Sequence, residues 1–276
     1  MTETMPETAQ RLGVITGLDE NLYHSDPHSI SASGAKTLLR SPAHFLAAKE
    51  NPKTTNALEL GTVVHSMILG VGAPYVAVEG NRNRKDVKAA IEEAEAEGKV
   101  VLKPDELTAA ERMADAVLTH ELAGKLLQGD PAESAEVSMF WTDLVWGVTR
   151  RCRWDWLNGN FGIGVDLKTT VNASPDVLPK DVMKWAYDLS AAWYLDVAAG
   201  CEVDLRAYCL LFVEKTPPYA VVPAELDDEF LARGRALSAR ALDTYRRCLD
   251  SGEWPSYVDE DRFISLTPPA WARNED

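Results

Sequence analysis

The sequence has few cysteines, no paired cysteine motif and no long apolar run. No two of its cysteines form a CxxC pair; they are Cys152, Cys201, Cys209 and Cys248. Such scattered cysteines are typical of reduced thiols, and an iron–sulfur cluster needs four converging thiolates, so we expect no cluster. No apolar run is long enough to span a membrane, and the polar stretch 1–10 lacks a signal-peptide core. We therefore expect a cytoplasmic protein that does not bind a membrane.

Positive charge is also scarce. The 276 residues include 28 Lys and Arg against 43 Asp and Glu, which gives a formal net charge of -15. This excludes a simple basic protein that coats nucleic acid. It is compatible with a nuclease, because catalytic carboxylates add negative charge and a basic channel can lie on an acidic body. Two local clusters are candidates for such a channel: Arg82, Arg84, Lys85 and Lys88, and Arg150, Arg151 and Arg153.

No repeat or low-complexity linker divides the chain, and its 46% hydrophobic residues suffice for a substantial core. We expect one domain over residues 21–265, with a flexible arm at 1–20 and a tail at 266–276. Apolar periodicity predicts helices over 31–40, 43–50, 58–69, 104–127, 179–199 and 225–249. Alternating patterns predict strands over 71–80, 135–142, 143–156, 161–168, 203–214 and 219–222. Residues 81–100 are charged, and we expect them to be exposed.

The most informative residues are Asp166-Leu167-Lys168, which follow an apolar run at 161–165. Asp166 and Lys168 are two apart, so on a strand they project to the same face. Asp155 precedes Asp166 by eleven residues. A hairpin at the polar turn 158–160 would bring these side chains together. Two carboxylates can hold a hard cation, and the lysine can stabilise charge or help activate water, so the pattern indicates metal-assisted phosphodiester hydrolysis.

This motif resembles the core of PD-(D/E)XK nucleases, and more narrowly that of the RecE-type exonucleases (exodeoxyribonuclease VIII) of phages and prophages. The upstream segments 23–27, 33–34, 41–45 and 61–65 resemble the same family, so the resemblance covers about residues 22–250. It implies an α/β fold with a restriction-endonuclease-like core. A central mixed β-sheet would be flanked by helices, with further helices at the N-terminal end.

The resemblance also implies roles for individual residues. Asp155 and Asp166 match metal-binding carboxylates, and Lys168 matches the catalytic lysine. His65 matches a helix histidine that helps to coordinate metal, and Glu136 an acid on the first core strand that serves metal and catalysis. The backbone of Leu167 would complete the metal site. The implied cofactor is Mg2+, with Mn2+ as a substitute.

Many relatives carry a Gln-x-x-x-Tyr motif on the helix after the core. Tyr194 matches its tyrosine, but Ser190 stands where glutamine is expected, and a hydroxyl reaches less far than an amide. We nevertheless expect both to lie against DNA. The basic lane beside them would consist of Arg150, Arg151, Arg153 and Lys168.

The implied activity is 5′-to-3′ digestion of linear double-stranded DNA ends, which leaves 3′ single strands for a RecT-like annealing protein in phage recombination. A homo-oligomeric ring, a trimer or tetramer, is also implied. One alternative is a single-strand or structure-specific RecB-like nuclease, and another is a catalytically idle DNA-binding or interaction module. From the residues alone, His65 is also typical of a core histidine, and Trp185 and Trp193 of packing.

Overall fold

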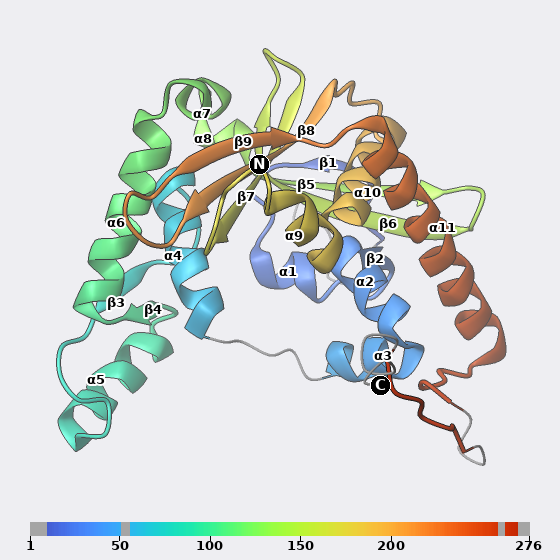
Figure 1. Ribbon diagram of the computed structural model, residues 1–276, viewed down its shortest axis with the longest axis horizontal. Helices are drawn as coiled ribbons and strands as arrows, with labels where there is room; N and C mark the ends of the chain where they lie inside the picture. The colour runs from blue at the N-terminus through green and yellow to red at the C-terminus, as the bar shows by residue number, and fades with distance from the viewer. Residues whose placement is uncertain (1–9, 51–55, 259–262, 270–276) are drawn as a thin grey trace, which may run out of the picture.

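A mixed sheet forms the centre of the computed structural model, which describes residues 10–50, 56–258 and 263–269 (Figure 1). Within these residues the sheet has seven strands, in the order β1-β5-β6-β7-β8-β9 with β2 placed beside β6. Its strands are β1 (Gly13–Ile15), β2 (Ser29–Ser31), β5 (Ala135–Asp143), β6 (Val148–Asn158), β7 (Ile163–Thr170), β8 (Ala207–Glu214) and β9 (Val221–Glu225). A separate two-stranded sheet consists of β3 (Tyr75–Ala77) and β4 (Val100–Leu102).

Helices cover both faces of the large sheet. The described helices of the first half are α1 (Glu20–His24), α2 (Ala32–Arg40), α3 (Pro42–Glu50), α4 (Asn56–Leu69), α5 (Lys85–Ala96), α6 (Pro104–Thr119), α7 (Glu121–Leu126) and α8 (Pro131–Ser134). Those of the second half are α9 (Leu178–Trp185), α10 (Tyr187–Gly200) and α11 (Asp228–Ser251). Ser31 begins α2 as predicted, because its hydroxyl accepts the Gly34 N–H at 3.1 Å.

The strand β8 is buried on both faces and separates two apolar cores. Tyr208, Leu210 and Phe212 pack against α2, α9, α10 and α11. Cys209, Leu211 and Val213 alternate with them and pack against α4, α6 and α7. The alternation continues on β7, where Val165 and Leu167 face the second core. Asp166 and Lys168 must therefore face the α9–α10 side.

The predicted hairpin at 158–160 is confirmed, and its two strands separate soon after the turn. Pairing of β6 with β7 covers only Asn158–Ile163, Leu157–Gly164 and Trp156–Val165. On the same edge of β6, β2 pairs with residues 149–151. Two strands thus share one edge of β6 and leave a gap between them at 152–155. Asp155 lies at this fork.

Two predicted helices are each broken in two. The helix predicted over 104–127 is α6 and α7, since His120 has an extended backbone and caps α7 by accepting the Ala123 N–H. The helix predicted over 179–199 is α9 and α10, which meet at Ala186 in the left-handed region (φ 48°). Periodicity misses both breaks because the apolar pattern continues across them. A helix, α5, also lies inside the charged stretch 81–100, for which we expected only exposure.

The predicted arm at 1–20 is wrong for its second half. Residues 13–15 form β1, which pairs with β5 from Phe140 to Ser138, and Glu20 begins α1. Residues 1–9 lie outside the described residues, as do 270–276 of the predicted tail. Among the described helices, none is both long and apolar enough to cross a membrane.

The hairpin supplies a test of packing. A Cβ at Gly164 would lie 2.1 Å from Cζ3 of Trp154, whose ring is fully buried. We expect Gly164→Ala to lower the free energy of unfolding by roughly 1–3 kcal/mol, because the ring must move in a filled core. Urea unfolding measures this. Gly159→Ala in the same hairpin is the control, since its Cβ would meet nothing within 4 Å. Equal effects of the two substitutions would contradict the packing argument.

Candidate active site

The fork between β6 and β7 exposes the backbone of Leu167 to side chains. Continuing the strand register would pair Leu167 with Trp154, but the ladder ends before that point. Instead, the Leu167 N–H donates to Oδ2 of Asp155 at 2.6 Å. Nε2 of His65 lies 3.0 Å from the Leu167 carbonyl oxygen and 3.2 Å from Asp155 Oδ2. One carboxylate and one imidazole therefore replace a missing pair of strand hydrogen bonds.

His65 is held in place by its own helix. Its Nδ1 lies 2.8 Å from the carbonyl oxygen of Gly61, one turn earlier in α4. Burial alone would lower the pKa of His65, but the Asp155 carboxylate and the bond to it outweigh burial and raise that pKa to about 9. In turn, burial favours a neutral Asp155, yet His65 and the Leu167 N–H hold the pKa of this carboxyl below its usual range. His65 and Asp155 thus form an ion pair at neutral pH.

Lys168 and Asp166 form a second ion pair on the α9–α10 side of the fork. Nζ of Lys168 also donates to the Leu167 carbonyl oxygen at 3.1 Å and lies 5.6 Å from the centre of the Tyr187 ring. Burial lowers the pKa of Lys168, but the carboxylates of Asp166 and Asp155 outweigh it, so the pKa is raised. In this arrangement Lys168 is a cation paired with Asp166.

Glu136 on β5 brings a third acid to the fork. Its backbone has φ 50°, in the left-handed region that costs a non-glycine residue about 1 kcal/mol or more. Burial and the negative charge of Asp155 raise its pKa to about 7, against the opposing charges of Arg153 and His65. Nε of Arg153 lies 3.6 Å from Glu136 Oε2. Glu136 and Asp155 are close enough to repel each other, and a bound cation would reduce this repulsion.

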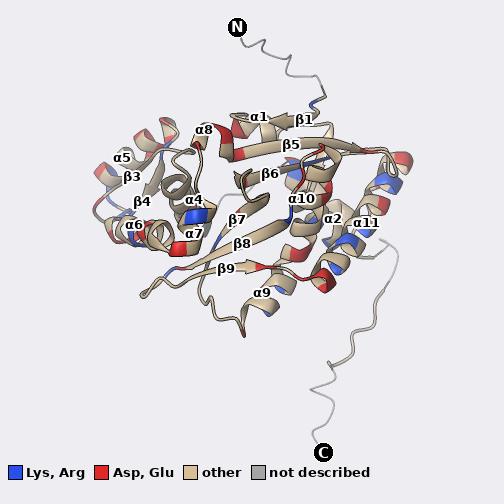
Figure 2. Ribbon diagram, turned by 90° about the horizontal axis from the view of Figure 1, so that it is seen from above, with Lys and Arg blue, Asp and Glu red and all other residues tan. Residues whose placement is uncertain are grey.

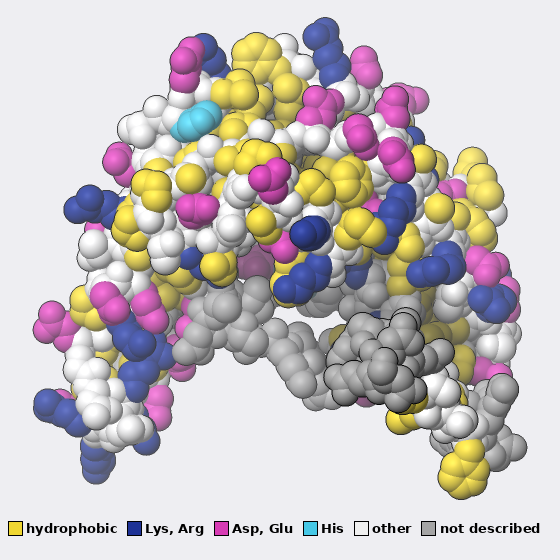
Figure 3. All heavy atoms as spheres, in the orientation of Figure 1, with side chains coloured by type: hydrophobic (Ala, Val, Ile, Leu, Met, Phe, Trp, Pro, Cys, Tyr) yellow, Lys and Arg dark blue, Asp and Glu magenta, His cyan; other side chains and the backbone are white. Residues whose placement is uncertain are grey.

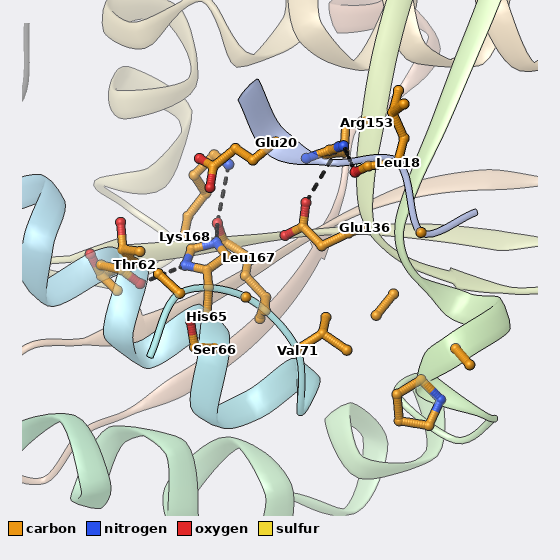
Figure 4. A pocket seen from close by; sticks show the side chains of 18 of the residues that line it. Leu18, Glu20, Thr62, His65, Ser66, Val71, Glu136, Arg153, Leu167 and Lys168 are labelled. Atoms are coloured by element: carbon orange, nitrogen blue, oxygen red, sulfur yellow. Dashed lines mark hydrogen bonds and ion pairs between the residues drawn. The ribbon is translucent and has the colours of Figure 1, made fainter. Parts of the chain in front are cut away.

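These side chains border a cavity of about 950 Å³, which is the size of a ligand pocket (Figure 4). Its lining includes Glu20, Glu136, Arg153 and His65. It also includes Lys168, Thr169, Trp185, Tyr187 and Lys215. Asp155 and Asp166 lie just behind the lining and reach the cavity through the groups that they bind.

The donor types fit a hard divalent cation. The Asp155 carboxylate and the Leu167 carbonyl converge on one protonated nitrogen of His65, and Glu136 adds an acid beside them. Among the described residues, however, no three His, Cys, Asp or Glu side chains are already arranged around a common metal position. The expected ligands are instead engaged in the pairs His65–Asp155, Lys168–Asp166 and Arg153–Glu136. Metal binding would have to displace these partners, beginning with a proton on His65.

The predicted basic lane is wrong for two of its three arginines. Arg150 is 3% exposed and pairs with Asp143 at 3.1 Å. Arg151 is 8% exposed and donates to the carbonyl oxygen of Ser29 at 2.7 Å. Period two does not reveal this burial because segments distant in sequence provide it: α10 covers Arg150, and β2 covers Arg151. Of the three arginines only Arg153 reaches the cavity, and charges of both signs are mixed over the outer helices (Figure 2).

The remaining predicted contacts with DNA have a different setting from the one expected. Ser190 is buried and does not line the cavity, which contradicts a contact with DNA. Tyr194 packs edge-on against Trp154, with ring centres 5.0 Å apart. The pKa of its hydroxyl is raised by burial and then by nearby groups that include Asp166. A DNA contact by Tyr194 stays a prediction.

Two charged residues near the site were not found from the sequence. Glu20 lines the cavity at the start of α1. Nζ of Lys36 lies 5.3 Å from the centre of the Tyr187 ring, so Lys36 and Lys168 share that ring. The signal for Lys36 was its spacing, because it follows buried Ala32 by four residues and so lies on the inner face of α2. Trp185, for which packing was the plainer interpretation, is 53% exposed, whereas Trp193 is fully buried.

A family model described as a PDDEXK-like domain of unknown function (DUF3799) matches residues 31–266. The chain belongs to this family. Its match to DUF3799 spans α2 through α11 and includes every residue of the fork. The predicted PD-(D/E)XK core is therefore confirmed, whereas the narrower RecE type stays a prediction. Nucleases with this core generally depend on divalent metals.

Solved structures support the same fold. A protein described as a candidate exonuclease from Eubacterium rectale has a TM-score of 0.61 and 15% identity, covering 95% of this chain and 99% of that one. A phage-related exonuclease from Haemophilus somnus has a TM-score of only 0.36 and 14% identity, covering 82% of this chain and 96% of that one. The second similarity is too low to carry an argument. No curated protein matches the chain.

Lys36 supplies a test of the charge arrangement. Burial, with the charge of Lys168, lowers the pKa of Lys36 to about 8 against the opposing charges of Asp166 and Asp188. A lowered lysine pKa means that the folded state disfavours the proton, so Lys36→Met should raise the free energy of unfolding, by roughly 1–2 kcal/mol at pH 7. The gain should be complete below pH 8 and shrink as pH rises from there toward 10.5, the ordinary lysine value.

Urea unfolding of both proteins across this pH range measures the difference. Lys49→Met, at an exposed position in α3, is the control and should change stability little. A loss of stability in Lys36→Met would mean that the carboxylates outweigh burial.

Proposed function

We propose that the chain is a divalent-metal-dependent deoxyribonuclease that digests linear double-stranded DNA from its ends. The observation that carries this proposal is the fork, where Asp155, His65, Lys168 and the Leu167 carbonyl meet within hydrogen-bonding distance in a PDDEXK-like domain. Mg2+ is the proposed metal, with Mn2+ as a substitute. The 5′-to-3′ direction and a role in phage recombination are proposed from the resemblance to RecE-type enzymes.

The residues divide the work by their charge. Asp155, Glu136, His65 and the Leu167 carbonyl would hold the metal, with Asp166 beside them. A bound metal supplies a Lewis acid that polarises the phosphate and makes water a better nucleophile. Lys168 is proposed to place its ammonium group against the phosphate and to stabilise the charge that develops there. Its pairing with Asp166 supports that role, since the pair fixes Nζ and keeps it charged.

We also propose an assembly and a partner. A net charge of -15 favours DNA binding in a confined place and not over the whole surface. A ring of three or four chains would gather such places around one duplex, and a RecT-like annealing protein would receive the single strand. Both proposals rest on the family resemblance.

A digestion assay tests the activity. End-labelled linear duplex and a covalently closed circle of the same sequence are incubated with Mg2+ or Mn2+, with EDTA as the metal-free control. We expect release of nucleotides from the linear substrate only. Cleavage of the circle at a similar rate would indicate an endonuclease. Absence of cleavage with either metal would favour an idle binding module, and a preference for single strands would favour a RecB-like enzyme.

Asp155 allows charge to be separated from hydrogen bonding. Asp155→Asn keeps an oxygen that can accept the Leu167 N–H but removes the negative charge. We expect a loss of activity of at least roughly 10–100-fold, and some loss of stability because His65 loses its compensating charge. Asp155→Ala should also lose roughly 1–3 kcal/mol of stability, because the Leu167 N–H loses its partner. The control is Asp176→Asn, at an exposed position. Unchanged turnover in folded Asp155→Asn would show that the active site is elsewhere.

A further inference from the structure

The cavity has an aromatic side chain that the chemistry of the fork does not use. Trp185 lines the cavity and is 53% exposed. The other tryptophans in the described part of the chain are buried or half-buried. Exposing an indole ring forgoes the stabilisation that burial would give. Because this ring lines the cavity of the candidate active site, it is placed to contact a ligand there.

The ring is fixed at a rigid corner. Trp185 is the last residue of α9, which is anchored by the buried side chains of Leu178 and Val182. Ala186 follows in the left-handed region, and α10 begins at once with Tyr187. Nζ of Lys184 lies 4.7 Å from the centre of the Trp185 ring. The strained turn at Ala186 therefore turns the chain between two helices and leaves the indole at the mouth of the cavity.

The charges around Trp185 suit a nucleotide. Lys168 and Lys215 line the cavity with Trp185, and Lys184 lies over the ring. Dark blue side chains, which are Lys or Arg, lie over the region of α9 at the centre of Figure 3. The acids Glu20 and Glu136 line the same cavity. The cavity thus combines acids, which suit a metal, with cations and aromatic rings, which suit phosphate and base.

We propose that Trp185 is a base-stacking residue, which holds the nucleobase next to the phosphate that Lys168 contacts. Trp185, Tyr187 and Lys168 line the same cavity, and the Tyr187 ring lies 5.6 Å from Lys168 Nζ. Stacking is tolerant of sequence because every base has a π-face. The residue would therefore position any terminal nucleotide without selecting a sequence. This inference rests on the proposed nuclease function.

A binding experiment tests the contact without hydrolysis. Duplexes carrying 2-aminopurine as the terminal base of either strand are titrated with protein in EDTA and low salt. We expect the unaltered chain to quench the fluorescence at one of the two ends. Trp185→Ala should lose this quenching, and Trp185→Phe should restore part of it. Met183→Ala is the matched control, because Met183 is in the same helix and is also 53% exposed but does not line the cavity.

A kinetic cycle tests the consequence. Trp185→Ala should raise KM for a normal linear duplex by about ten-fold, within the range of roughly five- to one-hundred-fold that one stacked base is worth. It should leave KM unchanged for a duplex with an abasic terminal nucleotide, which offers no ring. An equal rise for both substrates, or no rise for either, would overturn the stacking role. The role of Trp185 would then be structural, or it would be a contact with another protein.

The two proposals can fail separately. Hydrolysis of linear duplex by the unaltered chain, with equal quenching by Trp185→Ala, overturns the stacking role alone. Quenching that depends on Trp185 without any hydrolysis overturns the nuclease and keeps the contact. Absence of both hydrolysis and DNA binding by the unaltered chain overturns both.

Discussion

The site depends on the early separation of β6 and β7. Antiparallel strands normally satisfy each other's backbone groups, and breaking the ladder leaves polar groups that must find partners. Here the Asp155 carboxylate takes the N–H of Leu167, and His65 contacts its carbonyl oxygen. The same two side chains thereby stabilise the break and stand at the centre of the candidate active site. Structure and chemistry share one set of hydrogen bonds.

The second constraint is the balance of charge around this break. Three acids lie close together, and each is compensated by a neighbouring cation: His65 for Asp155, Lys168 for Asp166 and Arg153 for Glu136. Removing one partner would leave a buried charge without compensation, which is costly. These pairs therefore compensate the three acids, and they engage the donors that we propose for a metal. Metal binding would replace the proton of His65 and the cations that pair with the acids.

Sequence reasoning located the centre of the site because the chemistry was local. The spacing of Asp155 and Asp166 across a polar turn defined a hairpin, and period two placed Asp166 and Lys168 on one face. Sequence reasoning failed where segments distant in sequence determine whether a side chain is buried. Arg150 and Arg151 are charged and were expected to face DNA, but α10 covers Arg150 and β2 covers Arg151. The surroundings of Lys36 and Trp185 depend on how α2 and α9 pack near the end of β7. The apolar periodicity continues through the turn at Ala186 and so does not reveal that turn.

The position of β2 bears on where a folding unit can be cut. The family match begins at residue 31, whereas β1 and nearly all of β2 lie before it. A fragment trimmed to that boundary would expose an unpaired edge of β6 at 149–151, which other chains could join as an added strand. It would also deprive Arg151 of Ser29 and Arg153 of the Leu18 carbonyl. The N-terminal segment thus protects this edge of β6 from pairing with other chains. We expect a fragment without it to self-associate, which would prevent a measurement of its activity.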